Sequence, residues 1–294
     1  VGPEVLTPWK LDLLTNLYEG AKRVLTGDPD GRTEARFQRI YEVVAEFGTT
    51  EDERNWLSEK AAALPNNYCI SRPTQESAQR LLELKDINDG IAIWVNPVPD
   101  TNLIELSIGK SSSRRMGTFY KLAGTLSSLG LEIHGADIKP IGKSMMWYWM
   151  QFEDPSYRDR PSEYRLQEIK NSVHNQILGK AAKPIRFPSV WRPTEQLAAA
   201  IARPKIQVKI DNDTVSSATI IDVFSSDKAG LLYTVAKKIH QLSLDVTYAR
   251  TISYGNQVIG VYYVTDDDGN KIRNRSQLET IQSEIKETVL EFIE

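Results

Sequence analysis

Hydrophobic residues in the first 65 positions recur every three or four residues, the spacing of one face of an α-helix. The pair Thr7-Pro8 is typical of a helix start, because threonine can cap the helix and proline lacks an N–H that would have no partner. The apolar run 11–25 continues this helix, and residues 27–31 break it with glycine, aspartate and proline. Two further amphipathic runs, 37–47 and 56–64, predict a second and a third helix.

From residue 91 the pattern changes to strand, strand, helix, strand, strand, helix, and this order occurs twice. In the first copy we expect strands at 91–98 and 102–109, a helix at 117–129, strands at 132–141 and 144–152, and a helix at 164–178. In the second copy we expect strands at 206–211 and 218–225, a helix at 230–242, strands at 244–254 and 257–265, and a helix at 276–293.

Each helix of the second copy carries one apolar face, so both can cover the same side of an antiparallel sheet. This predicts an α+β fold of two ferredoxin-like domains preceded by a small helical segment. No strand follows Phe292, so the first strand of each copy is expected to complete its sheet. The domain boundaries are predicted as a helical segment at 1–88, a first domain at 89–180, a proline-containing linker at 181–204 and a second domain at 205–294.

Charge and cysteine content narrow the possible functions. The chain has 36 Lys and Arg against 39 Asp and Glu, a net charge of -3, so no overall positive field attracts nucleic acid or anionic lipid. RNA binding through the locally basic stretch 158–205 would require a steep dependence on salt. The single Cys69 excludes an internal disulfide and suits a reducing compartment. We expect a cytoplasmic protein without a membrane or nucleic-acid partner.

The sequence offers no convincing catalytic or metal site. No glycine-rich phosphate loop, helical His-x-x-x-His or nucleophile elbow is present. Asp266–Asn270 begins like a calcium loop, but Lys271 and Gln277 occupy positions where that loop needs glycine and glutamate. We therefore interpret it as a turn held by aspartate side chains and predict no catalytic residue, no metal and no cofactor.

One junction remains as a candidate binding site. Residues 227–232 lie between a predicted strand and a predicted helix, where the first helical N–H groups have no internal partner and attract a carboxylate. Gly230 would let the backbone approach a ligand, and Asp227 could receive an ammonium group. The predicted ligand-binding residues are Asp227, Ala229, Gly230, Leu231 and Leu232. The alternative is that Asp227 only caps the helix.

Specific segments then resemble a known family. Ile221–Tyr233 and Val258–Asp266, followed by Asp268–Ile272, closely resemble the C-terminal ACT domain of bacterial PII uridylyltransferases. Residues 7–18 resemble the segment that follows the family's HD hydrolase domain, and residues 64–68 resemble the approach to its first ACT domain. The resemblance therefore covers most of the chain.

This resemblance implies two ACT domains, which are ferredoxin-like modules that bind amino acids at their mutual interfaces. In the family, a nucleotidyltransferase domain and an HD domain add or remove uridylyl groups on the signalling protein PII, and the ACT domains report glutamine. Neither catalytic signature is found in this chain. The chain is accordingly expected to be a regulatory portion that binds glutamine and acts on PII through the parent enzyme, with ACT pairing within or between chains.

The chain departs from the family pattern at two places. The family tends to have an acid where this chain has Gly260. In the first copy, Arg114 stands where the second has Asp227, and an arginine prefers an anion to an ammonium group. The first-copy counterparts of the binding residues are predicted as Arg115, Met116, Gly117 and Thr118.

A second hypothesis is a scaffold that needs no ligand and docks onto the catalytic domains or PII. The strand containing Trp147, Tyr148 and Trp149 sends aromatic side chains to both faces of its sheet. An exposed aromatic there would indicate an interface.

Overall fold

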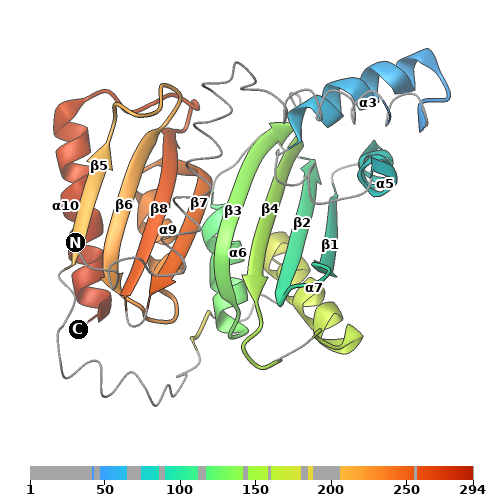
Figure 1. Ribbon diagram of the computed structural model, residues 1–294. Coiled ribbons are helices and arrows are strands. Elements are labelled where there is room, and N and C mark those ends of the chain that lie inside the picture. Colours follow the sequence, from blue (N-terminus) through green and yellow to red (C-terminus); the bar gives the residue numbers. More distant parts are fainter. Residues whose placement is uncertain are drawn as a thin grey trace, which may run out of the picture. The chain divides into compact units, whose positions relative to one another are not determined.

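The computed structural model divides the chain into two compact units, Val1–Leu82 and Glu83–Glu294 (Figure 1). It describes residues 42, 47–64, 74–85, 90–111, 117–141, 145–157, 160–179, 185–187, 206–254 and 257–293. The helices predicted before residue 47 and most of the predicted linker lie outside these residues.

The first unit contains helix α3 (Glu51–Ala63), which confirms the predicted third helix. It begins earlier than expected because the Thr50 side chain caps it, accepting a hydrogen bond from the Glu53 amide at 3.2 Å. A further helix, α5 (Thr74–Lys85), has no counterpart among the sequence predictions.

All twelve elements predicted in the repeat are present, with bounds within about two residues of those expected. The first copy forms β1 (Ile91–Pro97), β2 (Leu103–Ser111), α6 (Thr118–Ser128), β3 (Glu132–Ile141), β4 (Met145–Glu153) and α7 (Glu163–Leu178). The second forms β5 (Gln207–Asp211), β6 (Thr219–Ser226), α9 (Leu231–Gln241), β7 (Leu244–Tyr254), β8 (Gln257–Asp266) and α10 (Arg275–Ile293).

The strands of both copies form one antiparallel sheet in the order β1-β2-β4-β3-β7-β8-β6-β5. The first strand of each copy pairs with the second, which confirms that it completes its half of the sheet. The two halves meet where β3 pairs with β7, with Ala136 opposite Ala249. Two ferredoxin-like halves therefore pair side by side within one chain.

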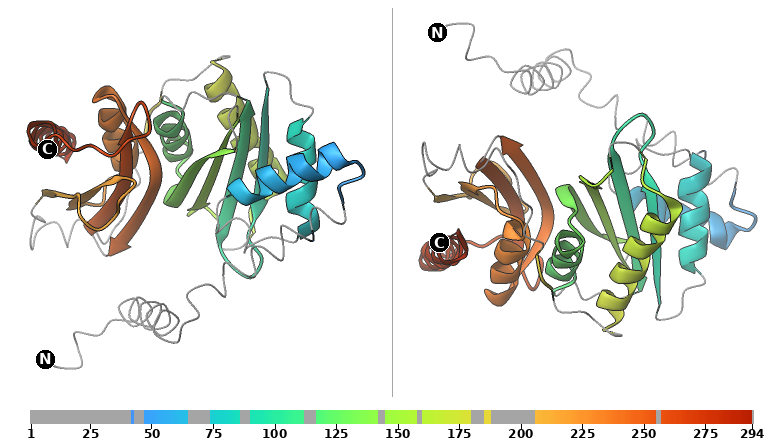
Figure 2. Two further views of the ribbon diagram at one scale, coloured as in Figure 1. Left: turned by 90° about the horizontal axis from the view of Figure 1, so that it is seen from above. Right: turned by 90° about the horizontal axis from the view of Figure 1, so that it is seen from below.

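Helices α6, α7, α9 and α10 cover one face of this sheet (Figure 2). Strand residues alternate between this face and the other, so in β4 the side chain of Tyr148 joins the core beneath the helices, whereas Trp147 and Trp149 point the opposite way. All three aromatic side chains are buried, and Trp147 stacks on Trp94 at 5.6 Å. The exposed aromatic that would have indicated an interface is absent from this strand.

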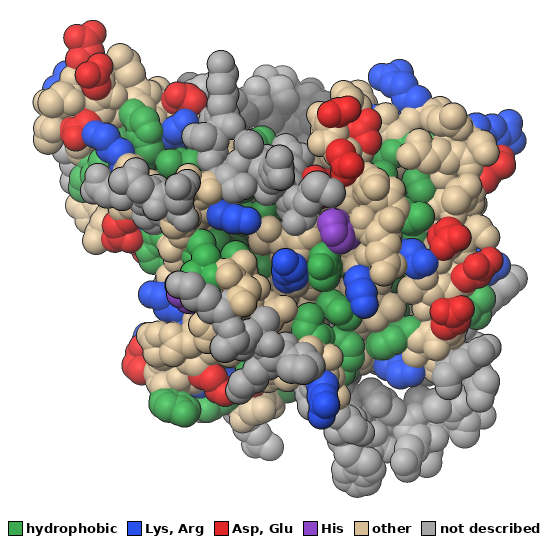
Figure 3. All heavy atoms as spheres, turned by 180° about the vertical axis from the view of Figure 1, so that it is seen from behind, with side chains coloured by type: hydrophobic (Ala, Val, Ile, Leu, Met, Phe, Trp, Pro, Cys, Tyr) green, Lys and Arg blue, Asp and Glu red, His purple; other side chains and the backbone are tan. Residues whose placement is uncertain are grey.

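The helix-bearing side carries charges of both signs (Figure 3). Lys, Arg and hydrophobic side chains alternate near the middle of this view, and Asp and Glu lie mostly toward its margins. This mixture fits the small net charge of -3.

Candidate functional site

The predicted junction lies between β6 and α9, and its glycine is the N-cap of the helix. Gly230 has φ 91°, in the left-handed region, and as a glycine it provides no side-chain capping hydrogen bond. The N-cap position of α9 is therefore held by Gly230 and not by Asp227. The Leu231 amide donates to the Lys228 carbonyl at 3.0 Å, whereas the Leu232 amide donates to no backbone carbonyl among the described residues. A first-turn N–H of α9 is thus available to a ligand.

This junction faces a cavity of about 430 Å³. The volume is within the range of about 300 to 1,000 Å³ that is usual for small-molecule sites. All five predicted binding residues of the second copy line it. The residues around the cavity are Ser127, Leu129–His134, Pro155, Ser156, Val223, Asp227–Leu232, Thr251, Val258, Gly260 and Tyr262.

One wall of the cavity comes from the first copy, and sequence reasoning missed it. The turn after α6 and the start of β3 supply Leu129 to His134, and the loop after β4 supplies Pro155 and Ser156. These segments are far from Asp227 in sequence and reach the junction only because α6 packs against α9 and β3 pairs with β7. The cavity therefore depends on both halves of the sheet.

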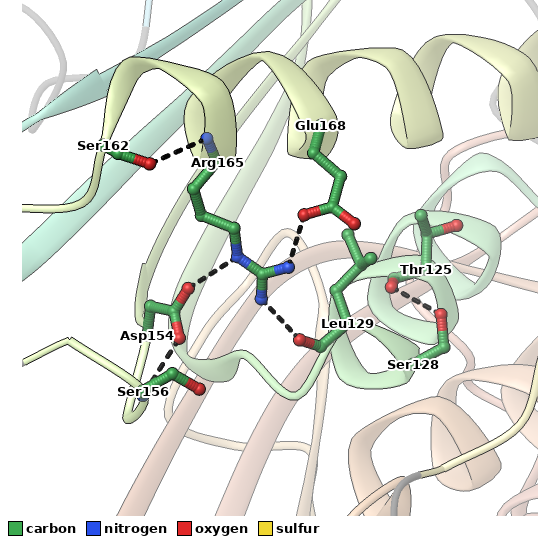
Figure 4. A network of polar contacts seen from close by, with 8 residues as sticks. All are labelled: Thr125, Ser128, Leu129, Asp154, Ser156, Ser162, Arg165 and Glu168. Carbon is green, nitrogen blue, oxygen red and sulfur yellow. Dashed lines mark hydrogen bonds and ion pairs between the residues drawn. The ribbon is translucent and has the colours of Figure 1, made fainter.

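Arg165 of α7 holds this wall in place (Figure 4). Its guanidinium donates to the Leu129 carbonyl at 2.7 Å and to the buried Asp154 carboxylate at 2.8 Å. Asp154 in turn accepts from the Ser156 amide at 3.1 Å. Burial acts to lower the pKa of Arg165, but the hydrogen bonds and charges of Glu168 and Asp154 outweigh it and raise the pKa. The guanidinium therefore stays charged while it joins two segments of the wall.

Tyr262 and Gly260 form the inner part of the cavity on β8. Tyr262 is 2% exposed, and burial raises the pKa of its phenol far above the ordinary value. The tyrosine therefore stays neutral and can donate or accept one hydrogen bond. A Cβ at Gly260 would lie 2.9 Å from the Tyr262 ring, so the absence of a side chain at Gly260 lets this ring pack there.

Gly230 makes room for a side chain of the protein, whereas the sequence predicted that it would make room for a ligand. A Cβ at this position would lie 2.5 Å from the ring of Phe187, so the absence of a side chain lets Phe187 pack against the junction. Phe187 also contacts Tyr233, with ring centroids 5.5 Å apart. Lys228 is engaged by α10, since its ammonium donates to the Phe292 carbonyl and lies 4.9 Å from that ring. Asp227 and Ala229–Leu232 line the cavity together with this engaged lysine.

Of the first-copy counterparts, the two that the structure describes, Gly117 and Thr118, do not line this cavity. Arg114, Arg115 and Met116 lie outside the described residues. Gly117 is the N-cap of α6, with φ 73°, and lines a separate cavity of about 10 Å³. Thr118 begins α6 and is buried. The structure thus brings together the second-copy residues, but not Gly117 or Thr118.

Asp266, at the start of the predicted aspartate turn, and Asp211 each hold a turn. Asp266 accepts hydrogen bonds from the Asp268 and Asn270 amides at 3.0 and 2.7 Å. Asp211 accepts from the Thr214 hydroxyl and amide and from the Asp213 amide, which lowers the pKa of Asp211 to about 2. No cluster of three or more metal-ligating side chains occurs within the described ranges. In the same ranges, no helix combines the length and apolar character needed to cross a bilayer.

The sheet order, the helices on one face and the cavity at the paired junctions define the class of ACT-like ferredoxin folds. In agreement, residues 207–294 match the family model "ACR9-like, ACT-like domain".

Along nearly its whole length the chain is similar to bifunctional uridylyltransferase/uridylyl-removing enzymes. It is 27% identical over 97% of its length to the enzyme of Caulobacter vibrioides (strain NA1000 / CB15N), of which it covers 30%. It is 26% identical to the enzyme of Zymomonas mobilis over 97% of the chain and 31% of the relative. It is 28% identical to the enzyme of Bradyrhizobium sp. over 96% of the chain and 30% of the relative.

The chain spans about 30% of the length of these relatives. The expected similarity to uridylyltransferases is confirmed, and the ACT-like domain agrees with a regulatory rather than a catalytic part.

Proposed function

We propose that this chain is a regulatory region that binds a free amino acid, glutamine in the first instance, in the cavity beside Asp227. The cavity at the β6–α9 junction is the observation that carries the proposal. An acidic residue, Asp227, and residues of the first turn of α9 line this one small space. A zwitterion presents complementary charges to these two groups.

The two ends of the ligand have different partners in this arrangement. The α-carboxylate accepts a hydrogen bond from the Leu232 amide at the positive end of α9. The α-ammonium donates to the Asp227 carboxylate. The side chain of the ligand extends over Val223 and Val258 toward the neutral hydroxyl of Tyr262. An uncharged side chain suits this environment, because burying a charge there would lack a compensating partner.

Binding regulates the larger protein through the packing of the two halves. The cavity wall comes from both copies, so a ligand stabilises the arrangement in which they close around it. The names of the relatives give two opposed activities, uridylyl transfer and uridylyl removal. We propose that glutamine shifts the balance between two such activities of a parent enzyme that acts on PII in the cytoplasm.

Isothermal titration calorimetry with glutamine tests the site directly. Asp227→Ala and the isosteric Asp227→Asn should each weaken binding by about ten- to a hundred-fold, the usual cost of losing a hydrogen bond to a charged group. Asp267→Ala is the matched control, because it removes an exposed carboxylate that does not line the cavity. Unchanged affinity in both Asp227 variants, or no heat with any amino acid, would contradict the proposal.

The scaffold hypothesis predicts a different result. A ligand-independent scaffold would capture PII to the same extent with and without glutamine. The regulatory proposal predicts that capture by the full-length enzyme changes with glutamine and that Asp227→Asn removes this dependence.

A further inference from the structure

The two halves of the sheet are related by an approximate two-fold axis. Their equivalent strands run outward in the same order from the β3–β7 pair. Helices α6 and α9 have 11 residues each, and both begin after a glycine N-cap in the left-handed region. Each feature of the cavity beside Gly230 should therefore have a counterpart beside Gly117.

The counterpart exists, but it is almost completely filled. It lies between Gly117 and the turn after α9 and measures about 10 Å³, against about 430 Å³ for the open cavity. A volume near 10 Å³ is about the room needed by one water molecule. An amino acid therefore cannot enter it without displacing side chains.

Strand register identifies one residue responsible for this difference. Ala136 and Ala249 face each other where β3 pairs with β7, so they are equivalent residues of the two halves. Their partners on the next strand, Met150 and Tyr262, are therefore equivalent as well. Ile138 and Thr251 lie two residues after Ala136 and Ala249, so they are also equivalent. Their partners on the next strand, Tyr148 and Gly260, therefore occupy equivalent positions. The closed side has a fully buried tyrosine where the open side has a glycine.

The helices supply a second responsible residue. Ser127 and His240 are each the tenth residue of their helix, counting from Thr118 and Leu231. Ser127 lines the open cavity, and His240 lines the closed one. The imidazole stacks on Tyr120 with ring centroids 5.0 Å apart, and its Nε2 would lie 3.2 Å from a Cβ at Gly117. His240 therefore occupies the space beside the first-copy junction.

We propose that, of the two symmetric cavities lined by described residues, only the one beside Gly230 is an amino-acid site, because Tyr148 and His240 fill its counterpart with the chain's own side chains. Gly260 and Ser127 keep the other site open. This inference rests on the proposed function for the identity of the ligand, but the difference between open and closed sites stands on geometry alone.

Cysteine labelling tests the difference without a ligand. Thr251 and Ile138 are equivalent and line the open and closed cavities, respectively. In a Cys69→Ser background, Thr251→Cys should react with iodoacetamide at least about ten-fold faster than Ile138→Cys, since thiol reactivity follows access. Equal rates in two folded variants would overturn the inference whether or not any amino acid binds.

Calorimetry tests the consequence for ligand binding. The unmodified chain should bind one glutamine, and Ser127→His should weaken binding by about ten-fold or more, because it overfills the cavity. Ser128→His is the matched control, since Ser128 does not line the cavity. His240→Ser should retain binding. Two sites per chain, or loss of binding in His240→Ser alone, would overturn the inference, whereas no binding by any amino acid would instead refute the proposed function.

Discussion

Arg165 shows how one side chain outside the cavity can determine its shape. The side chain of its partner Asp154 is 1% exposed, so the carboxylate depends on the guanidinium for charge compensation. The same guanidinium fixes the Leu129 carbonyl at the end of α6. Arg165 is therefore a positioning residue for the wall that the first copy contributes.

Arg165→Met should destabilise the fold by about 3 to 5 kcal/mol, because it leaves the Asp154 charge buried without its partner. Urea unfolding measures this change. Arg160→Met is the matched control, since the Arg160–Glu163 pair is exposed and should contribute less than about 1 kcal/mol. Equal losses in the two variants would contradict the role assigned to Arg165.

Asp137 at the β3–β7 junction should make stability depend on pH. Burial raises the pKa of its carboxyl above 3.8, although Lys139 at 3.8 Å acts in the opposite direction. A carboxyl group whose pKa is raised in the folded state does not lower the free energy of unfolding at a pH where it is protonated in both the folded and the unfolded protein. Its cost appears as pH rises from about 4 through the raised folded-state pKa.

Asp137→Asn should therefore gain stability relative to the unmodified chain between pH 4 and pH 7. Thermal unfolding at several pH values measures this trend, with the exposed Asp213→Asn as a control for removing any carboxylate. A difference that falls with rising pH would contradict the raised pKa.

At the scale of elements, the close contact of α6 and α9 depends on Gly124. A Cβ there would lie 2.6 Å from the Tyr233 ring of α9. Gly124→Ala would improve helix propensity by about 1 kcal/mol in an exposed helix, but the ring must move to admit the methyl group.

We expect Gly124→Ala to lower stability by about 1 to 3 kcal/mol, since overpacking outweighs propensity. Chemical denaturation measures the change, and the exposed Asn175→Ala in α7 reports propensity without a packing conflict. A stabilised Gly124→Ala would show that the two helices separate easily.

The sequence predicted more of the secondary structure than of the candidate site. The repeated elements were predictable because each strand and helix carries its own apolar period and the pattern occurs twice. Helix α5 was missed because only four of its 12 residues, Ala78, Leu81, Leu82 and Leu84, are apolar, which gives a weak amphipathic pattern. The Asp227–Leu232 junction was predictable from a strand, a glycine and a helix in succession. The wall at Leu129–His134 was not, because it arises from tertiary pairing of β3 with β7.

Differences between the two copies of the repeat contain a further signal for the candidate site. Aligning the two copies places Tyr148 opposite Gly260 and His240 opposite Ser127, which could have indicated two unequal sites. Assigning Tyr148 to Gly260 required the strand register, since the connection between β3 and β4 is one residue longer than the connection between β7 and β8. Here the sequence held the information, but only the fold showed which residues correspond.

At the scale of the whole second unit, the continuous sheet should make its two halves unfold together. Strands β3 and β7 pair at their centre, helices α6 and α9 pack on each other, and the cavity is lined by both halves. A ligand that binds only the folded arrangement therefore stabilises both halves by mass action.

Glutamine at a hundred times its dissociation constant should add about 2.7 kcal/mol, or about 5 to 10 °C in the unfolding midpoint. Hydrogen exchange should show slower exchange in both β4 and β8, because global unfolding limits exchange in core strands. Asp227→Asn should remove most of the shift at the same glutamine concentration, whereas Asp267→Ala should keep it. Protection confined to β6, β7 and β8 would contradict the joint unfolding of the halves, and the coupling of ligand to domain packing would then lose its structural basis.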